Sequence, residues 1–114
     1  MADETFPHET RSEFLVVLVT AASAEEAQTL ARTLVAEKLA ACVSRFPVQS
    51  TYTWEGNIED DDEWQLVIKT HRRQFQRLEG RVQELHSYDV PEIIALPIEM
   101  GSAAYLNWIG ATVS

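Results

Sequence analysis

The stretch Phe14-Leu-Val-Val-Leu-Val-Thr20 decides the fold, because it is strongly apolar, rich in valine and free of charged residues. Its composition favours an extended strand, and the lack of polar alternation is typical of a strand covered on both faces. A membrane-spanning helix would need about 20 apolar residues. We therefore expect residues 14–20 to form the central strand of a sheet in a soluble domain.

A helix is expected directly after this strand. Ser23 and Glu26 have the spacing of a capping box, in which the serine hydroxyl accepts from the Glu26 amide and the Glu26 carboxylate reaches back. The next apolar residues recur at helical spacing and should pack on the sheet as one stripe, comprising Ala27, Leu30, Ala31, Leu34 and Val35. The helix is predicted to end near Ala40.

A long β-hairpin is expected over residues 43–70. Its first strand, 43–54, carries large apolar side chains at alternate positions, namely Phe46, Val48, Tyr52 and Trp54. A kink is predicted at Pro47 and the turn at Gly56-Asn57. The second strand, 64–70, should place Trp64, Leu66 and Ile68 on one face.

This hairpin should extend beyond the core of its own domain. At about 3.3 Å per residue a strand of this length spans roughly 40 Å, three times the radius of gyration of a compact chain of this size. Tyr52, Trp54 and Trp64 would then form an exposed aromatic patch, which usually marks an interface. The pattern therefore predicts a homo-oligomer.

The rest of the chain completes an α+β fold. A helix is predicted over 72–86 from the spacing of Phe75, Leu78 and Val82, a covered strand within 91–98, and a short C-terminal helix over 102–110. The order strand, helix, strand, strand, helix, strand is that of a ferredoxin-like βαββαβ domain with both helices on one face. We expect residues 1–13 to be a flexible acidic tail and residues 14–114 to be the domain.

The charge of the 114-residue chain excludes several kinds of partner. Its formal net charge is −9, which repels nucleic acids and anionic membrane surfaces. With a single cysteine, Cys42, it cannot build an internal disulfide, which agrees with the cytoplasm. No nucleophile elbow or phosphate-binding glycine loop is present, so we expect no enzymatic activity.

Two groups of residues could bind metal. The acidic run Glu59 to Glu63 lacks calcium-loop spacing, and it is interpreted as a solvated turn that could bind divalent cations weakly. Cys42 and His86 offer a thiolate and an imidazole suited to copper or zinc. One chain supplies too few such ligands, although an oligomer could pool them; the alternatives are a buried Cys42 and a helix-capping His86.

Six strings occur in order that together resemble the CutA family of divalent-cation tolerance proteins. They are Ala40-Ala-Cys-Val43, Tyr52-Thr-Trp-Glu-Gly56, Ile68-Lys-Thr70, His86-Ser-Tyr88, Val90-Pro-Glu-Ile93 and Tyr105-Leu-Asn-Trp-Ile109. The resemblance covers about residues 14–109. It implies a homotrimer similar to the PII signalling proteins, and a role in cellular tolerance to copper and other divalent metals.

The resemblance also implies site residues. Lys69, Tyr105 and Trp108 match positions near a cleft between subunits, and Cys42 and His86 match the cysteine and a histidine of family motifs. Enterobacterial members proposed to bind copper have a further cysteine and histidine where this chain has Val19 and Leu85. The alternative function is a PII-like module or structural trimer that binds a small ligand or an unidentified protein partner.

Overall fold

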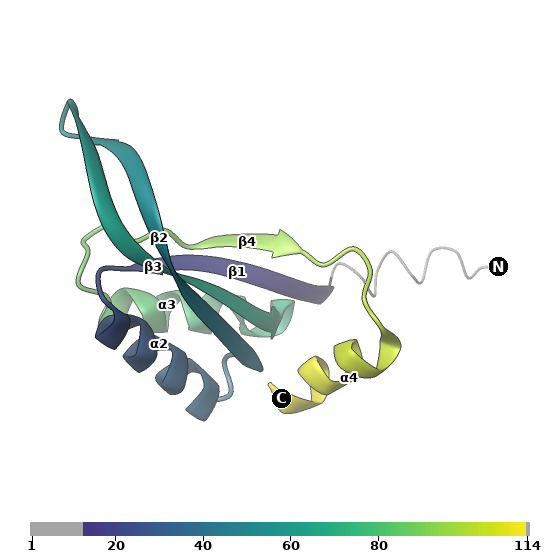
Figure 1. The fold of residues 1–114 in the computed structure, drawn as a ribbon. Helices are drawn as coiled ribbons and strands as arrows, with labels where there is room; N and C mark the ends of the chain where they lie inside the picture. Colours follow the sequence, from purple (N-terminus) through teal and green to yellow (C-terminus); the bar gives the residue numbers. More distant parts are fainter. Residues whose placement is uncertain (1–12, 114) are drawn as a thin grey trace.

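The computed structural model describes residues 13–113, which form one antiparallel sheet with the two longest helices packed on one face (Figure 1). The elements in chain order are β1 (Phe14–Ala21), α2 (Ala24–Ala36), β2 (Cys42–Trp54), β3 (Asn57–His71), the 3₁₀ turn η1 (Arg72–Gln74), α3 (Phe75–Leu85), β4 (Ile94–Pro97) and α4 (Ala103–Thr112). This confirms the predicted order of elements. Of the predicted tail, residues 1–13, all but Glu13 lies outside the described residues.

β1 lies inside the sheet, as predicted. The strand order is β2-β3-β1-β4, so β1 pairs with β3 on one side and with β4 on the other. Alternate residues of a strand point to opposite faces. Leu15, Val17 and Val19 therefore share the face that packs against Leu30 of α2 and Leu78 of α3 in the main core.

α2 begins as predicted but ends earlier. The Ser23 hydroxyl accepts from the Glu26 amide. The helix ends at Ala36, because Lys38 has a positive φ of 62° and the amides of Leu39 and Ala40 turn back to the carbonyl of Leu34. The prediction of an end near Ala40 is therefore wrong by about one turn.

The core stripe of α2 is also narrower than predicted. Ala27, Leu30, Ala31 and Leu34 are buried, but Val35 is 41% exposed. It lies at the edge of the apolar stripe, where the sheet no longer covers the helix.

The hairpin of β2 and β3 confirms the predicted overhang. The domain measures 53 × 29 × 22 Å, and Figure 1 shows the hairpin projecting far beyond the helices. Pairing runs without a break from Cys42 opposite Lys69 to Trp54 opposite Asn57. The turn is Glu55-Gly56, one residue earlier than predicted, because these two residues have positive φ values of 51° and 84°, as a two-residue type I′ turn requires.

The acidic run is part of β3 and does not form the solvated turn that was expected. Long-range pairing with β2 extends the strand through all five acidic residues. Alternation along the strand then divides them between two faces, with Glu59, Asp61 and Glu63 on one and Asp60 and Asp62 on the other. Glu63 is only 6% exposed.

Trp64 does not belong to the exposed aromatic patch, contrary to the sequence-based expectation. It shares a face with Leu66 and Ile68, as predicted, and that face packs against the main core. Tyr52 and Trp54 project from the opposite face of the hairpin and are exposed. The patch therefore consists of residues from β2 alone.

β4 is covered on one face only, so the expectation of a strand covered on both faces is wrong for the single chain. Ala95 packs on the main core, whereas Ile94 and Leu96 are 49% and 46% exposed on the face that the helices leave open. α4 packs through Leu106 and Ile109 on a second, smaller cluster at the end of β1. No helix among residues 13–113 is long and apolar enough to span a membrane.

Candidate functional site

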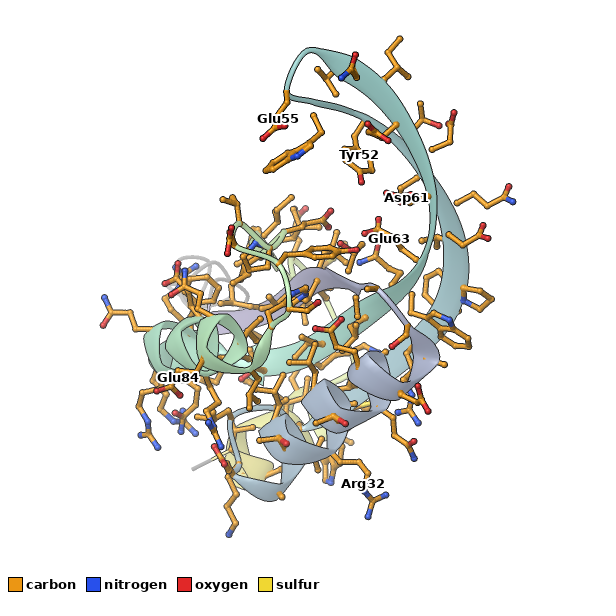
Figure 2. All side chains as sticks on the ribbon, turned by 90° about the vertical axis from the view of Figure 1, so that its left-hand side faces the viewer. Arg32, Tyr52, Glu55, Asp61, Glu63 and Glu84 are labelled. Atoms are coloured by element: carbon orange, nitrogen blue, oxygen red, sulfur yellow. The ribbon has the colours of Figure 1, made fainter. Side chains whose placement is uncertain are left out.

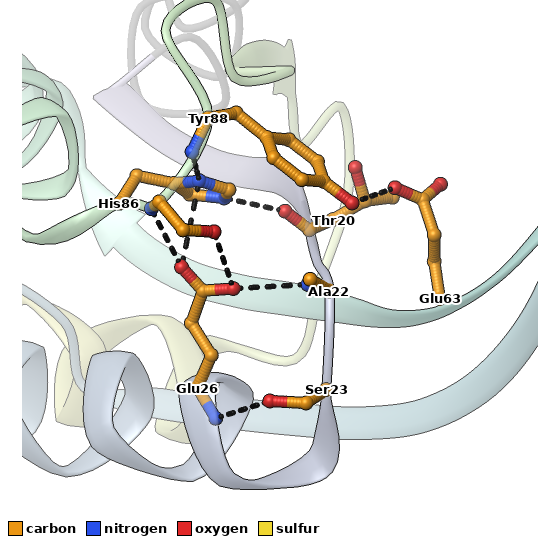
Figure 3. Close-up of polar contacts among 8 residues, drawn as sticks. Thr20, Ala22, Ser23, Glu26, Glu63, His86 and Tyr88 are labelled. Carbon is orange, nitrogen blue, oxygen red and sulfur yellow. Dashed lines mark hydrogen bonds and ion pairs between the residues drawn. The ribbon is translucent and has the colours of Figure 1, made fainter.

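A network of hydrogen bonds joins the start of α2 to the segment after α3 (Figure 3). The Glu26 carboxylate accepts from the backbone amides of Ala22 (3.0 Å) and Ser87 (2.8 Å) and from the Ser87 hydroxyl (3.1 Å). Partial burial acts to raise the pKa of Glu26, but these hydrogen bonds outweigh it and lower the pKa below the usual value. Glu26 thus holds residues 86–88 against α2 as an ionised carboxylate.

His86 is enclosed in this network. Its side chain is fully buried, with Nε2 2.7 Å from the carbonyl oxygen of Thr20 and Nδ1 3.0 Å from the amide nitrogen of Tyr88. The carbonyl can only accept and the amide can only donate, so Nε2 serves as a donor and Nδ1 as an acceptor in these two contacts. Within the chain both ring nitrogens are therefore occupied, and a metal ion would have to displace one of these partners.

Tyr88 connects the network to the carboxylates of the hairpin. Its hydroxyl donates to the carboxylate of Glu63 at 2.7 Å, and burial together with this hydrogen bond raises the pKa of Tyr88. Burial is also the main cause that raises the pKa of Glu92, and the nearby charge of Glu63 raises it further. A hydrogen bond from Gln65 lowers this pKa, but by less. Two carboxylates and a tyrosine therefore share a partly enclosed surface.

The acidic face continues toward the tip of the hairpin. Figure 2 shows Tyr52, Asp61 and Glu63 on the concave side of the curved ribbon. The Tyr52 hydroxyl donates to Asp61, and this hydrogen bond is the main cause that raises the pKa of Tyr52 to about 12. We call Glu59, Asp61 and Glu63, with Glu92, the acidic face.

A second group of predicted site residues gathers at the opposite end of β3. Cys42 lies directly opposite Lys69 in the β2–β3 pairing. Tyr105 lies beside Cys42, and burial, followed by the proximity of Cys42, raises the pKa of Tyr105. Trp108 is next to Tyr105, with ring centroids 5.5 Å apart. The structure thus brings Lys69, Tyr105 and Trp108 together with Cys42.

The structure does not bring Cys42 and His86 together within one chain. Cys42 lies beside Lys69, which pairs with Val16, whereas His86 contacts Thr20 of the same strand. Four residues of strand separate these points, or about 13 Å at 3.3 Å per residue. Among the residues that the structure describes, no group of three or more His, Cys, Asp or Glu side chains could hold a metal ion.

Sequence reasoning missed the roles of Glu26, Glu63 and Tyr88. The capping-box spacing did identify Glu26, but its carboxylate bonds Ala22 and Ser87, and only the folded chain brings Ser87 near α2. Glu63 stood in the acidic run with no sign that it alone would be buried.

Comparison with known proteins gives one consistent family. The model of the CutA1 divalent ion tolerance protein family matches residues 15–112. The divalent-cation tolerance protein CutA of Thermus thermophilus is 48% identical over 95 residues, covering 82% of this chain and 92% of that protein. The chloroplastic protein CutA of Arabidopsis thaliana is 47% identical over 96 residues, covering 83% of this chain and 53% of that protein.

The fold agrees with a solved structure of the same family. The periplasmic divalent cation tolerance protein CutA from Archaeoglobus fulgidus superposes with a TM-score of 0.87 at 42% identity. The match covers 89% of this chain and 99% of that one. This chain is therefore a member of the CutA family of divalent-cation tolerance proteins.

Proposed function

We propose that the protein acts in divalent-cation tolerance as a homotrimer whose acidic face attracts copper or another divalent cation weakly and diffusely, since no three such side chains of the described residues form a coordination site. The observation that carries this proposal is the placement of Glu59, Asp61 and Glu63 on one side of β3, with Glu92 close to Glu63. Carboxylate oxygens are common ligands of divalent cations, and the net charge of −9 raises their concentration near the surface.

Cys42 and His86 supply an alternative metal site. A thiolate and an imidazole suit copper or zinc better than carboxylates do. Since the two residues lie apart in one chain, this site would need ligands from different subunits. It would also need His86 to release the Tyr88 amide or the Thr20 carbonyl.

Isothermal titration with copper and zinc separates the two sites. Asp61→Asn should weaken binding, while Cys42→Ser and the matched surface control Glu25→Gln should bind as the parent does. Loss of a stoichiometric site in Cys42→Ser or His86→Gln, with Asp61→Asn unchanged, would overturn the acidic-face proposal in favour of the intersubunit site. Near-ultraviolet circular dichroism checks that each variant is folded.

The homotrimer is supported by the apolar surface that the single chain leaves open. Ile94 and Leu96 of β4 and Phe46 of β2 are exposed on the face opposite α2 and α3, at the two edges of the sheet. A second copy would bury them at a gain of about 25 cal/mol per Å². Leu96→Asp should lower the sedimentation coefficient to that of a monomer, whereas Val90→Asp, on an equally apolar exposed loop position, should not. A parent chain that sediments as a monomer at all concentrations would refute the trimer.

A second candidate function is the binding of a small ligand or a protein partner without a direct metal role. The grouping of Lys69, Tyr105 and Trp108 around Cys42 favours it, because it combines one cation with two aromatic rings. A thermal-shift screen should then show stabilisation by metabolites that Lys69→Gln abolishes.

We further propose that the protein acts in the cytoplasm and catalyses no reaction. The names of its relatives include a chloroplastic and a periplasmic protein.

A further inference from the structure

An open surface cavity of about 550 Å³, with Arg32 and Arg45 exposed at its edge, lies between the second half of α2 and the start of β2. Its apolar part is formed by Val35 and Ala36 of α2 and by Val43 of β2. Arg32 and Arg45 line it from the helix and from the strand. The volume is within the range of roughly 300–1,000 Å³ that is usual for small-molecule sites.

The two arginines have no partner among the residues that the structure describes. Among residues 13–113, no hydrogen bond or ion pair joins the side chain of Arg32 or Arg45 to another residue. By contrast, Arg81 is bound by Glu37 and Glu84. The chain carries 18 acidic residues, yet none of them lines this cavity. Two unpaired guanidinium groups thus share one cavity in a strongly acidic protein.

We propose that this cavity binds a small organic carboxylate. Its carboxylate would accept charge-assisted hydrogen bonds from Arg32 and Arg45, whose planar donor groups match carboxylate geometry. Its apolar portion would cover Val35, which is 41% exposed and has no cover of its own. An inorganic anion would use only the arginines and leave the apolar wall in water.

This site is separate from the residues assigned to metal binding. Arg45 lies on the side of the hairpin that carries Leu66. Cys42, Lys69 and the carboxylates of the acidic face project from the other side. Anion binding at this cavity therefore does not depend on the divalent-cation proposal.

Titration of the ¹⁵N-labelled full-length protein, followed by amide chemical shifts, tests the site. The probes are hexanoate, acetate and inorganic phosphate at equal ionic strength. Hexanoate should shift the resonances of residues 31–36 and 43–45 and bind more tightly than acetate or phosphate. Arg32→Gln and Arg45→Gln should each weaken hexanoate binding about tenfold. Arg77→Gln, an exposed arginine of α3 outside the cavity, is the matched control and should leave it unchanged.

Three results would overturn the proposal. The first is the absence of hexanoate shifts at these residues. The second is binding that persists in both Arg32→Gln and Arg45→Gln, or that Arg77→Gln reduces equally. The third is equal affinity for acetate, phosphate and hexanoate, which would show that the apolar wall takes no part.

Discussion

Glu26 accepts two hydrogen bonds from Ser87, at 2.8 Å from its amide and 3.1 Å from its hydroxyl, although 61 residues separate them in the chain. The same carboxylate also accepts from Ala22 at the start of α2. One carboxylate therefore accepts from backbone amides just before α2 and just after α3. The position of His86 and Tyr88 depends on this connection.

Replacement of Glu26 by Gln should lower the free energy of unfolding by about 1–2 kcal/mol at neutral pH, because hydrogen bonds to a charged acceptor are lost. Urea unfolding at one fixed protein concentration measures it. Glu25→Gln is the matched control, since Glu25 occupies the same helical turn and its side chain has no partner among the described residues. Equal losses in the two variants would show that the effect comes from the helix dipole instead.

The parent protein and Glu26→Gln should also differ in how their stability depends on pH. The pKa of Glu26 is lowered from its usual 4.5, so its contribution to stability is complete above pH 4.5 and is lost as the pH falls through the lowered pKa. The difference in unfolding free energy between parent and Glu26→Gln should therefore shrink in acid. A difference that stays constant from neutral to acid pH would contradict this assignment.

Tyr88→Phe should destabilise the protein by about 1–3 kcal/mol, because the buried carboxylate of Glu63 loses the hydroxyl that donates to it. Tyr52→Phe removes a similar tyrosine–carboxylate hydrogen bond at an exposed position and should cost less. Chemical denaturation of both variants compares them. A larger loss for Tyr52→Phe would mean that burial of Glu63 does not control the energy.

Tyr52 should ionise late. Its pKa is raised from 10.0 to about 12 by Asp61, so its contribution to stability is complete below pH 10 and is lost as the pH rises through 12. Tyrosinate absorbance of the parent and of Asp61→Asn measures this, and the variant should show one tyrosine that ionises nearer to pH 10. Unchanged titration in Asp61→Asn would assign the late ionisation to another tyrosine.

Two glycine substitutions should have opposite effects on stability. Gly56→Ala in the hairpin turn should destabilise by about 1 kcal/mol, because φ is +84° there. Gly80→Ala in α3 should stabilise by about 0.5–1 kcal/mol, because the added Cβ would meet no atom within 4 Å beyond its chain neighbours and the backbone of its own helix, and alanine favours the helix. Thermal unfolding of both variants checks the signs. A stabilising Gly56→Ala would show that the turn changes conformation in solution.

Most elements could be predicted from the sequence because their signals are local. The unbroken apolar stretch 14–20 and the alternation around Phe46 correctly indicated strands. Apolar residues three to four positions apart, from Ala27 to Leu34, correctly indicated a helix. The boundaries were less certain. Lys38, just after the end of α2, and Glu55, the first residue of the turn, have positive φ values although neither is a glycine.

The candidate sites depended on contacts between distant parts of the chain. The sequence by itself determined the residue types and their pattern: a run of carboxylates, one cysteine, the spacing of strands and helices, and an acidic net charge. Only the tertiary structure decided that Glu63 is buried against Tyr88, that His86 binds Thr20 far from Cys42, and that Arg32 meets Arg45 at one cavity. The physical reason is that side-chain periodicity depends on neighbours a few residues apart, whereas these contacts depend on strand register and on which faces pack together.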